Sequence, residues 1–399
     1  MKEISGGITA PKGFSASGIY AGIKRNKRPD LAIIYSERDA VAAGVFTTNK
    51  VKAAPVILTQ RQIRKGLARA IVVNSGNANA CTGKQGMADA KEMVELTANA
   101  LSVNKGLVCV ASTGVIGEPL PMEKIRPAIN LAAEGLSVDG GKAAATAIMT
   151  TDTFSKEVAV RAKINGRMVT VGGIAKGSGM IYPRMATMLA FITTDALIEQ
   201  DTLSGIFKKA VDSSFNKITV DGDTSTNDMV ICLANGMAGN KSAAGRDLEK
   251  FKEMLEHVCA VLSRMIVKDG EGATKLVEIR VKGAKNIKDA EKTGVSVANS
   301  NLVKTALFAC DPNWGRIMAA IGYAGAHVSS DAISISFDNI NLVKRGTGLG
   351  KDIEKKVIEV MQKREYTITI DLNIGNAEAA ILTTDLSYDY VKINVAYRS

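Results

Sequence analysis

Apolar runs of strand length, each ending in a glycine-rich turn, constrain the fold of this chain more than any other feature. They occur in ARAIVVNSGNANACTG (68–83), GLVCVASTGVIG (106–117), MVICLANG (229–236) and TKLVEIRVKGA (274–284). Between them, apolar residues recur at helical intervals in three stretches, 84–104, 121–136 and 247–269. Buried strands that alternate with amphipathic helices predict a layered α/β architecture, in which helices cover sheet.

The end of the chain has a different pattern. Residues 365–394 alternate between apolar and polar side chains, which predicts one or two β-hairpins. No repeat and no low-complexity linker marks a domain boundary along the chain. The clearest break in mid-chain is KGSGMIYPRMATMLAFITTDA (176–196), where a glycine-rich basic turn leads into a long apolar run.

Composition excludes several classes of protein. Of the 399 residues 46% are hydrophobic and 23% charged, which is typical of a globular chain with a large core. We expect no signal peptide and no membrane span, because no apolar segment has the required length. The net charge of +11 is spread along the chain and only 5% of residues are aromatic, so an anionic small molecule is favoured over nucleic acid as ligand. Five cysteines without a C-x-x-C pair indicate free thiols and a cytoplasmic protein.

Histidine is scarce, and this restricts the chemistry. The two histidines, His257 and His327, have no second histidine or cysteine at the spacing of metal ligands. We therefore expect no metal site and no cofactor that depends on one. A catalytic mechanism in this chain is expected to use a base other than histidine.

Threonine clusters offer such a mechanism. Hydroxyl-rich segments occur at 112–114, 150–153, 176–187 and 221–228, and each by itself is typical of turns and helix caps. An N-terminal threonine can use its own α-amino group as base, with an ordinary pKa of about 7.7–8.0. For Thr187 this requires scission after Ala186, a small residue that would crowd the attack very little. The alternative is that Thr187 is a structural residue of a strand.

Taken together, the motifs resemble one known family. AKGSGMIYPRMATMLAFITTDA is similar to the self-cleavage site of the glutamate N-acetyltransferase/ornithine acetyltransferase family (ArgJ). Further motifs extend the resemblance in order over nearly the whole chain: GITAPKGF, VVNSGNANACTG, STGVIGEPLP, MTTDTFSK, TVDGDTSTND, KDGEGATK, DPNWGRI and YVKINVAYRS. The resemblance implies a layered α/β sandwich of the self-processing N-terminal-nucleophile type that DmpA and ArgJ proteins share.

The resemblance also implies roles for particular residues. The precursor would cut itself between Ala186 and Thr187 into an alpha chain, 1–186, and a beta chain, 187–399, and two copies of each would assemble. Thr187 would be the nucleophile, and Thr113 and Gly114 would stabilise the oxyanion. The implied substrate-binding residues are Thr150, Lys176, Thr187, Glu271, Asn394 and Ser399. For Ser399, a frayed chain end is an equally good interpretation.

The implied activity is transfer of the acetyl group from N-acetyl-L-ornithine to L-glutamate through an acetyl-Thr187 ester, a step of arginine biosynthesis. No cofactor is implied, and acetyl-CoA is an open alternative as acetyl donor. Two other functions remain open: a self-processed aminopeptidase or amidase that passes the acyl group to water, and a non-catalytic ligand-binding oligomer. Oligomer size, feedback inhibition by arginine and thermal stability are not encoded in any motif that we recognise.

Overall fold

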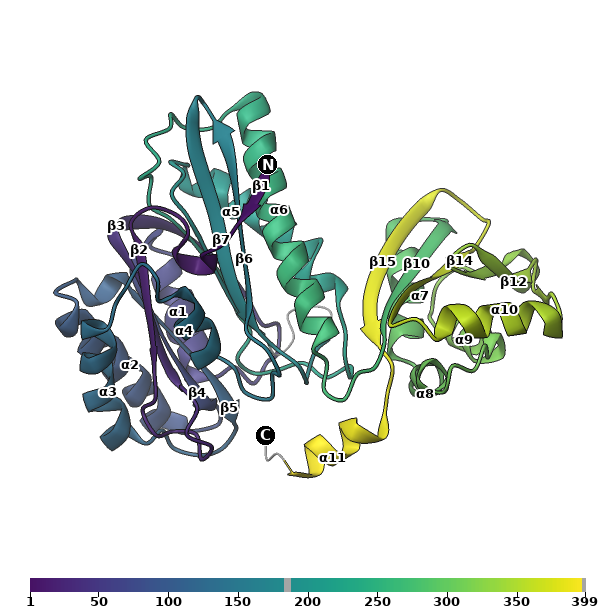
Figure 1. Cartoon of the computed structure of the whole chain (residues 1–399), viewed down its shortest axis with the longest axis horizontal. Coiled ribbons are helices and arrows are strands. Elements are labelled where there is room, and N and C mark those ends of the chain that lie inside the picture. The colour runs from purple at the N-terminus through teal and green to yellow at the C-terminus, as the bar shows by residue number, and fades with distance from the viewer. Residues whose placement is uncertain (183–187, 397–399) are drawn as a thin grey trace.

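The computed structural model describes residues 1–182 and 188–396, and its strands form two sheets, of nine and of six strands (Figure 1). The larger sheet has the order β1-β6-β7-β8-β9-β3-β4-β5, with β2 paired to β3. Its strands are β1 (Lys2–Ile4), β2 (Phe14–Ile19), β3 (Leu31–Phe46), β4 (Leu67–Asn77), β5 (Val108–Val115), β6 (Lys156–Ile164), β7 (Arg167–Lys176), β8 (Leu189–Thr194) and β9 (Met229–Ala234).

Helices pack against both faces of this sheet. They are α1 (Ala54–Ile63), α2 (Gly83–Ala100), α3 (Met122–Glu134), α4 (Gly141–Ala147), α5 (Gln200–Asp212) and α6 (Gly245–Lys268). Helices α2 and α3 lie on one outer face, α5 and α6 on the other, and α4 and part of α1 in the central core. Alternate residues of a strand point to opposite faces, so Leu31 and Ile33 of β3 pack with α2 and α3, whereas Ala32 and Ile34 point the other way.

The inward face of the sheet builds a central core. Ala32 and Ile34 share one apolar cluster with Ile174 of β7, Phe191 of β8 and other inward residues of β7–β9, and α5 and α6 cover the outer face of β6–β9. Strands β2–β5 and β6–β9 of the one sheet therefore form two layers that face each other across this core, and helices lie on the outer side of each layer. This arrangement confirms the predicted layered α/β sandwich.

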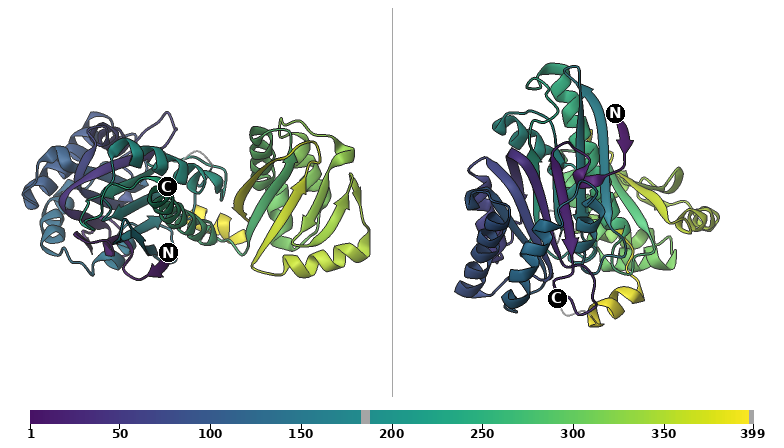
Figure 2. Two further views of the ribbon diagram at one scale, coloured as in Figure 1. Left: turned by 90° about the horizontal axis from the view of Figure 1, so that it is seen from above. Right: turned by 60° about the vertical axis from the view of Figure 1, so that its left-hand side comes forward.

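The second sheet forms a separate lobe (Figure 2). It has the order β13-β12-β11-β14-β10-β15. Its strands are β10 (Leu276–Ala284), β11 (Ser334–Phe337), β12 (Ile340–Lys344), β13 (Thr347–Gly348), β14 (Glu365–Asp371) and β15 (Ala377–Thr384). The helices that follow β10 in the chain are α7 (Ile287–Asn299), α8 (Asn301–Ala309), α9 (Trp314–Gly322), α10 (Lys351–Met361) and α11 (Tyr388–Ala396). Helix α11 leaves β15 and runs back toward the first lobe (Figure 1).

Most predicted elements are confirmed, and one prediction is wrong. The helices expected at 84–104, 121–136 and 247–269 are α2, α3 and α6. The hairpin expected within 365–394 does not form, because β10 lies between β14, its parallel neighbour, and β15, its antiparallel neighbour. The last part of that segment is the helix α11. Alternation identifies strands and their buried faces, but it does not identify the pairing partner.

Two further features concern the exposure of the cysteines and the apolar character of the helices. Of the five cysteines, all of them free thiols, Cys109, Cys232 and Cys259 are buried, Cys310 is half-buried and Cys81 is exposed. Among residues 1–182 and 188–396, no helix combines the length and the apolar character needed to cross a membrane.

Candidate active site

The predicted site residues that the structure describes come together in one pocket. Thr113, Gly114, Thr150, Lys176, Glu271 and Asn394 all line a cavity of about 180 Å³. Larger cavities of about 590 and 620 Å³ elsewhere are lined by none of these residues. Residues that are far apart in the sequence thus form one polar site. The order of the motifs along the chain does not by itself require that they meet.

The carboxyl end of β5 supplies Thr113 and Gly114. Gly114 has φ +133°, and a Cβ atom there would lie 2.3 Å from the carbonyl carbon of Gly76 in the parallel neighbour β4. A glycine is therefore required for this close approach of two strand ends. The side chain of Asn227, which also lines the pocket, donates hydrogen bonds to the carbonyl oxygens of Ala78 (2.6 Å) and Ser112 (2.8 Å) and so ties the end of β5 to the segment after β4.

Lys176 brings a buried cation to the same place. It is the last residue of β7, only 2% exposed, and its Nζ atom lies 3.4 Å from Oγ1 of Thr113. Burial lowers the pKa of Lys176, while the carboxylate of Asp152 opposes that effect. The pocket therefore contains a positive charge that lacks the hydration it would have in water.

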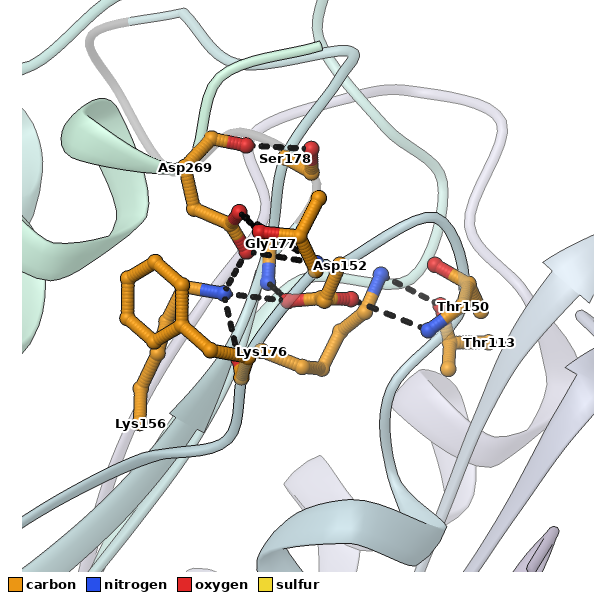
Figure 3. A network of polar contacts seen from close by, with 10 residues as sticks. Thr113, Thr150, Asp152, Lys156, Lys176, Gly177, Ser178 and Asp269 are labelled. Carbon is orange, nitrogen blue, oxygen red and sulfur yellow. Dashed lines mark hydrogen bonds and ion pairs between the residues drawn. The ribbon is translucent and has the colours of Figure 1, made fainter. Parts of the chain in front are cut away.

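A buried ion cluster supports this part of the pocket (Figure 3). Lys156 Nζ lies 2.6 Å from Asp152 and 2.5 Å from Asp269. Asp152 also accepts hydrogen bonds from the backbone N–H groups of Thr150 (2.9 Å) and Gly177 (2.8 Å). Although burial opposes the effect, Lys156 and Lys176 hold the pKa of Asp152 below its usual range. One carboxylate thereby fixes the loops that carry Thr150 and Lys176.

Glu271 and Asn394 form another part of the pocket lining. The Asn394 side chain on α11 donates a hydrogen bond of 2.8 Å to Oε2 of Glu271, and the backbone N–H of Glu271 donates one of 3.0 Å to Ser178. A Cβ atom on Gly179 would lie 2.4 Å from the Glu271 carboxyl group, so a glycine makes room for this carboxylate. The C-terminal segment therefore reaches the pocket as a helix.

Three predicted site residues, Ala186, Thr187 and Ser399, lie outside the described residues. The first residue after this gap is Met188, which is buried and precedes β8. Its backbone N–H donates a hydrogen bond of 2.9 Å to Oδ1 of Asp228, a residue that follows directly on the pocket-lining Ser225, Thr226 and Asn227.

Sequence reasoning missed several residues of the site. The pocket is also lined by Asp221, Asp223 and Tyr390, and supported by Asp152, Lys156 and Asp269, none of which was assigned a role. All six lie in motifs that carry the family resemblance, TVDGDTSTND, MTTDTFSK, KDGEGATK and YVKINVAYRS. The available signal was Lys156, four residues after Asp152 in MTTDTFSK. Side chains at this spacing usually form an exposed ion pair, and so the signal does not by itself indicate a buried one.

The described part of the chain contains no cluster of three or more histidine, cysteine, aspartate or glutamate side chains that could hold a metal ion. His257 contacts Glu3 and His327 contacts Asp289, so both histidines have partners away from the pocket. Within the described pocket lining, the ionisable groups are carboxylates, the Lys176 ammonium and the Tyr390 hydroxyl.

Comparisons with known proteins agree with the family resemblance that the sequence motifs indicate. The sequence model of the ArgJ family matches residues 15–399. The chain is 50% identical to the arginine biosynthesis bifunctional protein ArgJ of Symbiobacterium thermophilum and 50% identical to the glutamate N-acetyltransferase of Methanocaldococcus jannaschii, in both cases over the whole of both chains. It is 44% identical to a solved structure, the ornithine acetyltransferase of Mycobacterium tuberculosis complexed with ornithine, over 46% of this chain and 97% of that chain, with a TM-score of 0.43. Because the family model and these full-length relatives cover nearly every residue, the chain belongs to the ArgJ family.

Proposed function

We propose that this protein is an acetyltransferase that moves the acetyl group of N-acetyl-L-ornithine to L-glutamate, after cutting itself between Ala186 and Thr187. The observation that carries the proposal is the shared pocket of Thr113, Gly114, Thr150, Lys176, Glu271 and Asn394. Family membership supports the proposal, because one full-length relative at 50% identity is named glutamate N-acetyltransferase and another is named arginine biosynthesis bifunctional protein ArgJ.

In the first half-reaction, Oγ1 of Thr187 attacks the acetyl carbonyl carbon of acetylornithine, and the α-amino group of Thr187 accepts the hydroxyl proton. Thr113 through its hydroxyl and Gly114 through its N–H stabilise the oxyanion. The carbon–nitrogen bond to ornithine then breaks. The ammonium group returns the proton to the leaving nitrogen, and an acetyl ester of Thr187 remains.

In the second half-reaction, the amine of glutamate attacks the ester carbonyl and gives its proton to the same α-amino group. The bond from the carbonyl carbon to Oγ1 breaks, the proton returns to Oγ1, and N-acetyl-L-glutamate leaves. A covalent intermediate that both substrates share requires ping-pong kinetics.

The remaining pocket residues would bind substrate. Lys176 is the buried cation and suits a substrate carboxylate, because charge-assisted hydrogen bonds are strongest away from water. Glu271 suits the side-chain ammonium group of ornithine, and Asn394, its hydrogen-bond partner, holds it in place. Thr150 and Ser399 would complete the substrate contacts.

The proposed cut falls within the larger sheet, since β7 ends before it and β8, paired with β7, begins after it. Chains 1–186 and 187–399 would therefore stay associated through that pairing. Two copies of each are the proposed assembly, in a reducing cytoplasm that suits the free thiols.

Mass spectrometry and an exchange assay test the proposal together. The intact-mass spectrum of the purified protein should show two chains whose masses sum to that of the precursor plus one water. N-acetyl-L-glutamate should form from acetylornithine and glutamate with ping-pong kinetics. A single uncut chain that transfers acetyl groups at full rate would overturn the proposal.

Three further assays separate the alternatives. Release of acetate without any need for glutamate would identify a hydrolase of the aminopeptidase or amidase kind. An uncut, inactive chain that binds ornithine would identify a binding protein. Formation of acetylglutamate from acetyl-CoA alone would show that the protein uses a second donor.

A further inference from the structure

The pocket has to accept two side chains that end in opposite charges. In the proposed reaction ornithine leaves and glutamate enters at the same acetyl ester, so their α-amino groups occupy the same position. The two side chains carry their charged atoms at the same number of bonds from the α-carbon, one as an ammonium group and the other as a carboxylate. The same part of the pocket must therefore bind both charges.

The charged groups of the described lining suit only one of these side chains. Glu271 suits an ammonium group, and Asp221 and Asp223 add two further carboxylates to the lining. Lys176 lies beside Thr113, where the acetyl group would react, and so suits the α-carboxylate that both substrates share. Because like charges repel, the side-chain carboxylate of glutamate needs an uncharged hydrogen-bond donor in this part of the pocket.

Both N–H donors of Asn394 are already engaged. Its side-chain nitrogen donates one hydrogen bond of 2.8 Å to Oε2 of Glu271 and another of 3.0 Å to the carbonyl oxygen of Tyr390. A side-chain amide has only these two donors. Tyr390 also lines the pocket, one turn earlier on α11, and a Cβ atom on Gly272 would lie 2.5 Å from its backbone nitrogen. The donor beside Glu271 is therefore the Tyr390 hydroxyl.

The Tyr390 hydroxyl has a long hydrogen bond that it can exchange. It donates to Oδ2 of Asp221 at 3.3 Å, which exceeds the usual O–H···O distance of about 2.5–3.0 Å. Asp221 does not depend on this bond, because its Oδ2 also accepts the N–H of Met180 (2.5 Å) and its Oδ1 accepts the N–H of Ile181 (2.8 Å). The hydroxyl can therefore turn to another acceptor while Asp221 keeps its backbone partners.

The hydroxyl also keeps its proton. Burial and the nearby carboxylates of Asp221 and Glu271 raise the pKa of Tyr390 above its ordinary value. The phenol is therefore uncharged at neutral pH. An uncharged donor of this kind can bind a carboxylate without repelling an ammonium group.

We propose that the hydroxyl of Tyr390 turns from Asp221 to the side-chain carboxylate of glutamate and binds it in the second half-reaction. With ornithine in the pocket, the ammonium group binds Glu271 and the hydroxyl stays with Asp221. Tyr390 is thereby a residue that favours an acidic amino acid as acetyl acceptor. The inference deepens the proposed function and rests on it, because it assigns one substrate of that reaction to a named side chain.

The test compares Tyr390→Phe with the wild-type protein and with Tyr388→Phe. Each substitution removes a single hydroxyl group from α11. Tyr388 is the matched control, because it is 77% exposed, does not line the pocket and contacts the ring of Phe308 edge to face.

The measurement is a competition between two acceptors. Each protein receives unlabelled acetylornithine as donor, with equal concentrations of glutamate and of ornithine that is isotopically labelled at its α-amino nitrogen. Both acceptors compete for one acetyl-enzyme, so the ratio of the initial rates of acetylglutamate and labelled acetylornithine formation equals the ratio of their kcat/KM values. This ratio does not depend on the amount of active protein, and so it is valid even for a variant that is only partly cut.

We expect Tyr390→Phe to lower the ratio of acetylglutamate to labelled acetylornithine by about ten-fold or more, because a hydrogen bond to a charged group is lost. Tyr388→Phe should keep the wild-type ratio. The substitution should lower kcat/KM for acetylornithine much less than kcat/KM for glutamate.

An unchanged or raised ratio in Tyr390→Phe would overturn the inference, since a residue that only places α11 affects ornithine at least as much as glutamate. An equal shift in Tyr388→Phe would also overturn it, and so would complete loss of the exchange of labelled ornithine in Tyr390→Phe. If the wild-type protein itself forms no acetylglutamate from acetylornithine, the proposed function fails instead.

Discussion

Nζ of Lys176 lies 3.4 Å from Oγ1 of Thr113, and both side chains are almost completely buried. A hydroxyl oxygen that accepts a hydrogen bond from an ammonium group keeps its own proton free to donate. The lysine therefore both carries charge into the pocket and leaves the threonine O–H available to a developing oxyanion. This relationship leads to the first two predictions.

Thr113→Ala should lower kcat for acetyl exchange by about 10²–10³-fold, because one oxyanion donor is lost. Thr113→Ser keeps the hydroxyl and should retain most of the activity. Steady-state kinetics on protein shown by mass spectrometry to be cut is the measurement. A fully cut Ala variant with wild-type kcat would remove Thr113 from the oxyanion site.

Lys176 should make substrate binding sensitive to alkaline pH. Its pKa is lowered by burial, so its positive charge is lost at a lower pH than that of an exposed lysine. KM for acetylornithine should accordingly rise as the pH increases through that lowered pKa, whereas Lys176→Met should have a high KM at every pH. A KM that is independent of pH up to the range of an ordinary lysine would contradict this role.

Glu271→Ala should raise KM for acetylornithine much more than KM for glutamate, because only ornithine presents a side-chain ammonium group. Gly179→Ala provides an independent version of the test, since its Cβ would lie 2.4 Å from the Glu271 carboxyl group and displace it. Both variants should change the two KM values in the same unequal way. Equal effects on the two substrates would remove the assignment.

The Lys156–Asp152–Asp269 cluster should stabilise the fold. Lys156→Met leaves two buried carboxylates without their cation and should lower the free energy of unfolding by about 3–5 kcal/mol, measured by urea denaturation. Lys208→Met removes an exposed partner of Asp212 and should change the free energy by less than about 1 kcal/mol. Similar effects of the two substitutions would show that burial of the cluster adds nothing.

The same cluster should make the free energy of unfolding depend on pH in the acidic range. The pKa of Asp152 is lower in the folded protein than in the unfolded chain, so its contribution is present above the unfolded pKa of about 3.9. That contribution is lost as the pH falls below this value toward the folded pKa. The wild-type protein should therefore lose stability in this acidic range more steeply than Lys156→Met, in which the ion pairs are already absent. Parallel pH curves for the two proteins would contradict this interpretation.

Much of the site could be recognised from sequence because each motif is a short local signal. Thr113 and Gly114, Lys176 and Glu271 each lie in a short motif that resembles the corresponding motif of the family. Asp228 was not assigned, because nothing in TVDGDTSTND distinguishes a buried aspartate from one in a solvated turn. Its meaning depends on Met188, forty residues away, whose N–H it binds.

The alternation of apolar runs and amphipathic helices was enough to establish the α/β class, since side-chain periodicity is a local property of a strand or helix. Periodicity carries no information about which strands pair, and so the sequence could not reveal that β10 separates β14 from β15. Nor could it show that α11 brings Asn394 to Glu271. Long-range burial and pairing decided these features, because a carboxylate, a lysine or an amide acquires its chemistry from the partners and the solvent exclusion that folding imposes on it.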